Sequence, residues 1–198
     1  MLVTADAAVR ERAWSFKDHG KNEATMRAPR RGQHGFLPVH DSFGTNWRMT
    51  EMQAAIGRVQ LRKLDNWVAR RRRNAMRLTK YLKANPAIDI PMPPKGVGHS
   101  FYKLYAFVRP DRLSDGWDRD RLLREINAAG APCFTGASPE IYLERAFQDA
   151  GLAPDRPCET ARSLGQRSLM FQVHPTLKDR HIDWVGATVR GVLDRAAR

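Results

Sequence analysis

The chain has 198 residues, of which 42% are apolar and 28% charged, enough for one domain or one domain with an appendage. No stretch of 18 apolar residues occurs, so we expect no membrane-spanning helix. The formal net charge is +13, and residues 1–100 carry 19 Lys/Arg against 8 Asp/Glu. Such an excess in one half favours a polyanionic ligand or an acidic partner.

The first part of the chain predicts a short strand, a helix and a long loop. Residues 1–4 are typical of the end of a strand, and residues 6–16 carry apolar side chains at helical spacing. Residues 18–43 show no period and contain several prolines and glycines, and loops of this length are usually functional or disordered. The loop also carries basic side chains suited to an anion: Arg27, Arg30, Arg31, His34 and His40.

A long helix follows. Thr50 can cap it, and apolar residues at mostly three- and four-residue spacing continue to about residue 84, where Asn85-Pro86 ends it. Prolines and glycines over residues 91–98 predict a stiff connector, so we place a domain boundary near residue 90.

The second half predicts a small α/β or α+β layer unit. The expected elements, in chain order, are a strand at 101–108, a helix at 119–129, a strand at 132–135, helices at 139–150 and 157–164, a buried strand at 168–173 and a closing helix at 178–195.

Several kinds of catalytic site are absent from the sequence. There is no Gly-x-Ser-x-Gly nucleophile turn and no Gly-rich phosphate loop. His34 and His40 have no acidic pair to complete a metal site, so no metal is expected. The two cysteines, Cys133 and Cys158, are too few for a disulfide scaffold, and we expect both to be reduced in a cytoplasmic protein.

Asn46-x-Arg48, after Gly44 and directly before the long helix, is the most informative pattern. An amide and a planar guanidinium at a helix N-terminus are donors suited to phosphate or carboxylate. Taken alone, the pattern could equally be a turn with a surface salt bridge.

Five segments, in the right order, resemble the DegT/DnrJ/StrS family of pyridoxal phosphate (PLP) sugar aminotransferases. The most specific is residues 44–57, which is similar to the signature Gly-x-Asn-x-Arg-Met-x-Glu-x-Gln-Ala-Ala-x-Gly. The others are residues 1–22 with the pair His19-Gly20, the arginine-ended helix 61–73, the aromatic strand 99–105, and the late strand with a His-Pro turn at 168–177.

The resemblance implies the C-terminal part of an aspartate-aminotransferase (fold type I) α/β architecture. Residues 1–90 would be a remnant of the large PLP domain, and residues 91–198 the small domain. Such enzymes transfer an amino group from glutamate to a keto-sugar on a nucleotide, in amino-sugar or lipopolysaccharide biosynthesis, at a dimer interface. By resemblance, Asn46 reaches the cofactor phosphate of the partner, and Arg48 lies beside it at the partner's substrate site.

Further substrate contacts are implied by the same resemblance. Arg31, His34 and His40, in the basic loop, would line the substrate site of the partner, where a pyrophosphate suits their charge. Tyr102 and Thr135 would contact the sugar, although a core aromatic and an ordinary turn are the alternative interpretations.

The catalytic lysine of the family has no counterpart in the sequence. Lys17 and Lys21 follow the first strand, whereas the Schiff-base lysine of the family precedes it, so we expect it upstream of residue 1. We therefore expect no catalytic residue in the chain and no activity of the chain alone, which would work as a homo-oligomer or with a missing N-terminal half.

The second hypothesis is a basic interaction or regulatory protein that binds an acidic partner or nucleic acid. It rests on the net charge of +11 in residues 1–100 and on Arg70-Arg71-Arg72-Arg73, a run that can also be a solvated helix face. Nucleic-acid binding is disfavoured because aromatic residues are not interleaved with the basic ones.

Overall fold

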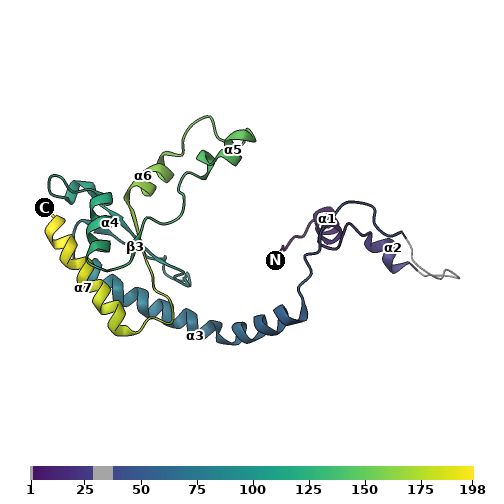
Figure 1. Ribbon diagram of the computed structural model, residues 1–198, viewed down its shortest axis with the longest axis horizontal. Helices are drawn as coiled ribbons and strands as arrows, with labels where there is room; N and C mark the ends of the chain where they lie inside the picture. The colour runs from purple at the N-terminus through teal and green to yellow at the C-terminus, as the bar shows by residue number, and fades with distance from the viewer. Residues whose placement is uncertain (1, 29–37) are drawn as a thin grey trace. The chain divides into compact units, whose positions relative to one another are not determined.

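A computed structural model of the chain describes residues 2–28 and 38–198, and it consists of two compact units, Met1–Arg62 and Lys63–Arg198 (Figure 1). This division falls earlier than the boundary expected near residue 90. The reason is that the last turns of the long helix bury Leu78 and Leu82 in the core of the second unit, and that the segment after it adds a strand to the sheet of that unit.

The first unit is built around helix α1 (Ala7–Lys17), which begins as predicted. Asp6 caps it by accepting hydrogen bonds from the amides of Ala8 and Val9. Residues 2–4 form no strand, contrary to expectation, because no described segment pairs with them. A second helix, α2 (Glu23–Arg27), lies within the span predicted to be loop, where Asn22 caps it.

Helix α3 runs over Glu51–Leu82 and confirms the predicted long helix and its cap. Thr50 Oγ1 accepts from the Gln53 amide at 3.3 Å, and Gln53 Oε1 accepts from the Thr50 amide at 2.9 Å, which makes a capping box. The buried residues of α3 all lie near its C-terminal end: Asn74, Ala75, Leu78, Thr79 and Leu82.

The second unit contains a four-stranded antiparallel sheet in the order β1-β2-β4-β3. Its strands are β1 (Ile88–Asp89), β2 (Leu104–Val108), β3 (Cys133–Phe134) and β4 (Ser168–Phe171). The three later strands confirm predictions, whereas β1 falls just before the predicted connector and had not been expected. The register pairs Leu104 with Phe171 and Ala106 with Leu169.

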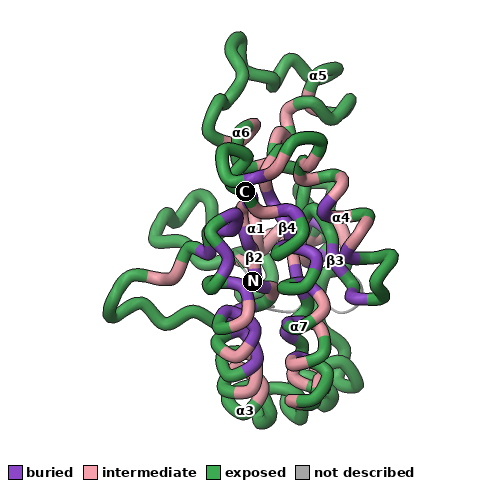
Figure 2. Tube along the Cα trace, turned by 90° about the vertical axis from the view of Figure 1, so that its left-hand side faces the viewer, coloured by how far each residue is buried: buried purple, intermediate pink, exposed green. Residues whose placement is uncertain are grey.

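Helices α4 (Arg119–Ala128) and α7 (Asp179–Ala196) share one core with the sheet and the end of α3. Alternate residues of β2 point into it, and Figure 2 shows buried residues gathered along the strands and the neighbouring helices. The fully buried side chains include Leu78, Leu104, Leu122, Leu169, Phe171, Ile182 and Leu193.

The helix predicted over 139–150 is instead two short pieces, a 3-10 turn η2 (Ile141–Leu143) and helix α5 (Arg145–Asp149). Glu144 between them is extended, with ψ 138°, which interrupts the helical path. Helix α6 (Glu159–Arg167) and the 3-10 turn η1 (Pro110–Arg112) complete the unit, and α5 lies away from the sheet (Figure 1). No helix in the described ranges is both long and apolar enough to cross a membrane.

Candidate functional site

Backbone hydrogen bonds attach the Asn46–Arg48 segment to the C-terminal end of α1. The Thr45 amide donates to Phe16 O at 2.7 Å, and the Trp47 amide donates to Lys17 O at 2.9 Å. Asp18 and Asn46 consequently form an isolated antiparallel bridge. Residues distant in sequence are thereby fixed as neighbours in the first unit.

Two glycines make this close approach possible. Gly20 has φ +80°, and a Cβ placed on it would lie 1.7 Å from the carbonyl oxygen of Ser42. A Cβ on Gly44 would lie 2.4 Å from the Gly20 nitrogen. The preceding His19 also has positive φ, 62°. The His19-Gly20 pair therefore has a structural reason: only glycine fits at this turn.

Arg48 lies at the centre of a small charged cluster. Its Nε is 3.2 Å from Asn46 Oδ1 and 3.6 Å from Asp18 Oδ1, and its Nη2 is 3.5 Å from His19 Nε2. Lys21 Nζ approaches the same Asp18 oxygen at 3.3 Å. Burial by itself raises the pKa of Asp18, but the contact with Lys21 and the positive charges of Arg48, Lys21 and Lys17 outweigh it, so the pKa is lowered and Asp18 stays ionised.

Asn46 keeps its amide donor available. Its Oδ1 accepts from both the backbone amide and the Nε of Arg48, while its Nδ2 donates to no other residue in the described ranges. The amide N–H of Asn46 and the guanidinium of Arg48 are the donor set that a phosphate group needs, so these residues fit one end of PLP. The capping box already occupies the Gln53 amide, so the N-terminus of α3 has fewer unpaired backbone N–H groups for an anion than the sequence indicated.

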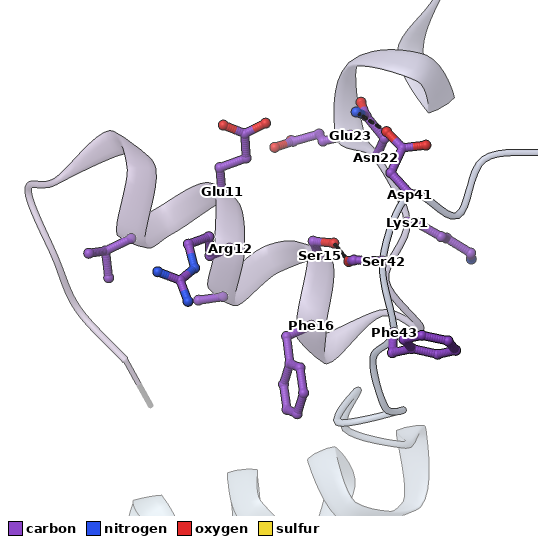
Figure 3. A pocket seen from close by; sticks show the side chains of 12 residues that line it. Glu11, Arg12, Ser15, Phe16, Lys21, Asn22, Glu23, Asp41, Ser42 and Phe43 are labelled. Atoms are coloured by element: carbon purple, nitrogen blue, oxygen red, sulfur yellow. Dashed lines mark hydrogen bonds between the residues drawn. The ribbon is translucent and has the colours of Figure 1, made fainter.

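A hollow of about 660 Å³ lies between α1, α2 and residues 41–43 (Figure 3). Its polar rim includes two hydrogen-bonded pairs, Ser15 with Ser42 and Asn22 with Asp41. Its apolar lining comes from the face of α1 that carries apolar side chains at helical spacing, together with the fully exposed Phe43. The stripe is therefore present but uncovered: Val9, Ala13 and Phe16.

The predicted substrate residues fall in different places. His40 is exposed and pairs with Lys21 through an isolated bridge, beside the cluster described above. Arg31 and His34 lie outside the described residues. Tyr102 and Thr135 belong to the second unit.

Each of these two residues has its own surroundings. Tyr102 is exposed and is not a core aromatic. Thr135 is also exposed, and its carbonyl oxygen accepts a hydrogen bond from Ser168 Oγ at 2.5 Å. Thr135 lines a hollow of about 270 Å³ together with Arg119, Glu140 and Arg162.

The arginine run on α3 is engaged in intramolecular contacts. Arg70 donates to Leu177 O and pairs with Asp179, Arg71 donates to Tyr102 O, and Arg72 donates to His99 O. These three residues attach α3 to two loops of the second unit. Three of the four side chains of the run are thus held by contacts within the second unit, although Arg72 and Arg73 remain exposed.

Sequence reasoning missed Asp18 and Lys21 at the Arg48 cluster. Their only signal was their position on either side of the His19-Gly20 pair. Among the residues whose placement is described, no group of three or more His, Cys, Asp or Glu side chains could hold a metal ion.

Comparison with known proteins shows one family. A sequence profile of the DegT/DnrJ/EryC1/StrS aminotransferase family matches residues 1–190. The erythromycin biosynthesis sensory transduction protein EryC1 of Saccharopolyspora erythraea is 29% identical over 96% of this chain and 46% of its own length. The dTDP-3-amino-3,4,6-trideoxy-alpha-D-glucose transaminase of Streptomyces venezuelae is 28% identical over 89% of this chain and 41% of its own length. The chain thus spans less than half the length of these relatives.

Solved structures show the same fold. An aminotransferase from Psychrobacter cryohalolentis matches with a TM-score of 0.83 and 40% identity, over 97% of this chain and 50% of that one. The E. coli GDP-4-keto-6-deoxy-D-mannose-3-dehydratase with bound hydrated PLP matches with a TM-score of 0.74 and 22% identity, over 94% of this chain and 49% of that one. PLP is the cofactor of the family.

Proposed function

Because the chain belongs to the DegT/DnrJ/EryC1/StrS aminotransferase family, we propose that it supplies the phosphate-side donors and the small domain of a PLP-dependent sugar aminotransferase. The observation that carries this is the Nδ2 of Asn46, which donates to none of the described residues and is held beside Arg48 by the Asp18 bridge. When bound, PLP supplies the electron sink for amino transfer. Asn46 and Arg48 bind and orient its phosphate, and Asp18 and His19 hold Arg48 in place.

For the substrate we propose a keto-sugar carried on a nucleoside diphosphate, with glutamate as the amino donor. The name of the S. venezuelae relative specifies a dTDP-linked amino sugar. The excess of 19 Lys/Arg over 8 Asp/Glu in residues 1–100 suits a ligand that carries a pyrophosphate.

We also propose that the 198-residue chain does not transaminate by itself. The two lysines next to the Asn46 site have other contacts: Lys17 Nζ lies 5.4 Å from the centre of the Trp14 ring, and Lys21 pairs with Asp18. Neither lies in the sequence context of the lysine that carries PLP in the family. The lysine would come from protein outside residues 1–198.

The apolar surface of the first unit supports association with further protein. Among the described residues of Met1–Arg62 none is a buried hydrophobic residue, although α3 and the residues before it present large apolar side chains. They include Trp47, Met49, Met52, Ile56 and Leu61, each more than 60% exposed. Surfaces of this kind mark interfaces. We propose a homo-oligomer, and sedimentation that shows only monomer across the micromolar range would contradict it.

The test of the phosphate contact compares PLP with pyridoxal, which lacks the phosphate. We expect PLP, but not pyridoxal, to shift the backbone amide NMR signals of Asn46 and Trp47. Asn46→Asp replaces the donor by an acceptor with negative charge, so it should weaken PLP binding at least tenfold, since a hydrogen bond to a charged group is worth about 1.5–3 kcal/mol. Asn66→Asp, at an exposed position on α3, adds the same charge and should have little effect.

Two results would contradict the proposal. One is equal shifts with PLP and pyridoxal, which would show that the phosphate is not recognised. The other is equal weakening by Asn46→Asp and Asn66→Asp, which would show that only the total charge of the chain matters.

A further inference from the structure

A hollow of about 400 Å³ lies between α3 and α7 of the second unit, where these two helices run side by side (Figure 2). Three cationic side chains, one carboxylate and one tyrosine line it. They are Arg77, Lys80 and Tyr81 from α3, and Asp183 and Arg190 from α7. Charged groups of both helices thus meet at one place on the surface of the unit.

Three of the lining side chains hold one another in place. A Cβ placed on Gly186 of α7 would lie 2.5 Å from Cγ and Cδ2 of Tyr81, so the ring can lie this close to α7 only because residue 186 is a glycine. The Tyr81 hydroxyl donates to Asp183 Oδ1 at 3.0 Å. Arg77 donates to both oxygens of Asp183, from Nε at 2.5 Å and from Nη2 at 2.7 Å. Side chains that are already ordered lose little conformational freedom when a ligand binds.

The lining of the hollow carries more positive than negative charge. Arg77 and Asp183 neutralise each other. Lys80 has no ion-pair or hydrogen-bond partner within residues 2–28 and 38–198. Arg190 Nε lies 3.6 Å from Asp194 one turn later on α7, and both side chains are more than half exposed, so this pair is weak. Lys80 and Arg190 therefore present two positive charges to an external anion.

We propose that Lys80, Arg190 and Arg77 bind a tetrahedral oxyanion of charge −2, which is a phosphate ion or the phosphoryl group of a small molecule. The two cations on facing helices match this charge, whereas a carboxylate would offset only one of them. Arg77 has five N–H groups, of which Nε, Nη1 and Nη2 each use one on Asp183 or Asp179, so two remain for oxygens of the anion. The site belongs to the second unit and Asn46 to the first, so it goes beyond the proposed function.

The test is an NMR titration of the ¹⁵N-labelled 198-residue chain with phosphate, sulfate and acetate at constant ionic strength. It is done at about pH 8, where phosphate carries about two negative charges. NMR reads each position separately, so binding at the hollow is distinguished from binding of the same phosphate at Asn46. Phosphate and sulfate should shift the backbone amide signals of Tyr81, Gly186 and Ala187, and acetate should leave them unchanged.

Substitution of the two unneutralised cations should weaken this binding. Lys80→Gln and Arg190→Gln should each weaken phosphate about fivefold, which converts to about 1 kcal/mol, the value of a well-placed exposed ion pair. The double substitution should abolish the shifts. Arg124→Gln removes an equal charge at an exposed position on α4 and should leave binding unchanged.

Four results would overturn the proposal. Phosphate may leave the signals of the hollow unshifted, or acetate may shift them as much as phosphate does, which would show only a general effect of anions. The shifts may survive the double substitution, or Arg124→Gln may weaken phosphate as much as Arg190→Gln does. Tighter binding of a single-stranded oligonucleotide, lost in the double variant, would also overturn it in favour of nucleic acid.

A titration with glycerol phosphate separates the two sources of the anion. Inorganic phosphate that binds more tightly than glycerol phosphate supports the free ion as the ligand, and the reverse order supports a phosphomonoester. Asn46→Asp should change neither titration at the signals of the hollow, because it lies in the other unit. The proposed cofactor contact and this anion site can therefore fail separately.

Discussion

Truncation of two aliphatic side chains on α3 should change the free energy of unfolding by very different amounts. Leu78 is fully buried in the core of the second unit, whereas Ile56, six turns earlier on the same helix by the α-helical repeat of about 3.6 residues, is 62% exposed. Leu78→Ala removes buried methyl groups and leaves a cavity, so it should lower the free energy of unfolding by about 3 kcal/mol, within the usual range of roughly 2–5 kcal/mol. Ile56→Ala should change it by less than about 0.5 kcal/mol, because little buried area is lost and alanine favours the helix.

Urea denaturation followed by circular dichroism measures both effects, at a protein concentration where sedimentation shows monomer. A loss of about 3 kcal/mol should move the urea midpoint by roughly 1–2 M, given a denaturant dependence of about 1–3 kcal/mol per M. If Ile56→Ala cost as much as Leu78→Ala in the monomer, the first half of α3 would be covered within this chain. That result would refute the reasoning that the first unit lacks a core of its own.

Three further predictions follow from single positions. Gly20→Ala should shift or broaden the NMR signals of Asn46, because the new Cβ would collide with the Ser42 carbonyl. Gly57→Ala, with no atom within 4 Å of the new Cβ, should leave these signals unchanged. Equal effects of the two substitutions on the Asn46 signals would contradict this. The pKa of Asp183 is lowered chiefly by the hydrogen bond from its arginine partner on α3, so the ionised carboxylate stabilises the fold fully above about pH 4 and less as the pH falls through the lowered pKa. The difference in melting temperature between wild type and Asp183→Asn should therefore shrink in acid. A difference that widens in acid would refute the direction of the pKa shift. Burial raises the pKa of the Cys133 thiol to about 12, so a thiol reagent at neutral pH should modify only the exposed Cys158, and fast modification of both would contradict the buried position.

Local sequence patterns predicted most of the second unit. Apolar spacing identified α3, α4 and α7, and alternation identified β2, because these elements bury one continuous face in the same core. β1 is only two residues long and has no periodicity to detect, and its existence depends on pairing with β2. The break at Glu144 is likewise not encoded as a proline or glycine, so a continuous helix was the natural expectation.

The first unit was predicted less well, for a physical reason. The strand expected at residues 1–4 and the apolar stripe of α1 are patterns that need a covering partner, and no described part of the unit provides one. Asn46 and Arg48 were selected from the motif as candidates, and their link to Asp18 depends on backbone bonds between segments far apart in sequence. The roles of Arg71 and Arg72 as clamps required the structure, because a run of like charges carries no information about its partners.

The most direct test of the central claim is the glutamate half-reaction. The 198-residue chain is mixed with PLP and glutamate, and 2-oxoglutarate is measured against PLP alone. We predict no rate above that of free PLP, because in the proposed function the chain contributes phosphate donors and a small domain but no lysine placed for the chemistry. Turnover well above that rate, abolished by a single Lys→Arg substitution, would contradict the account.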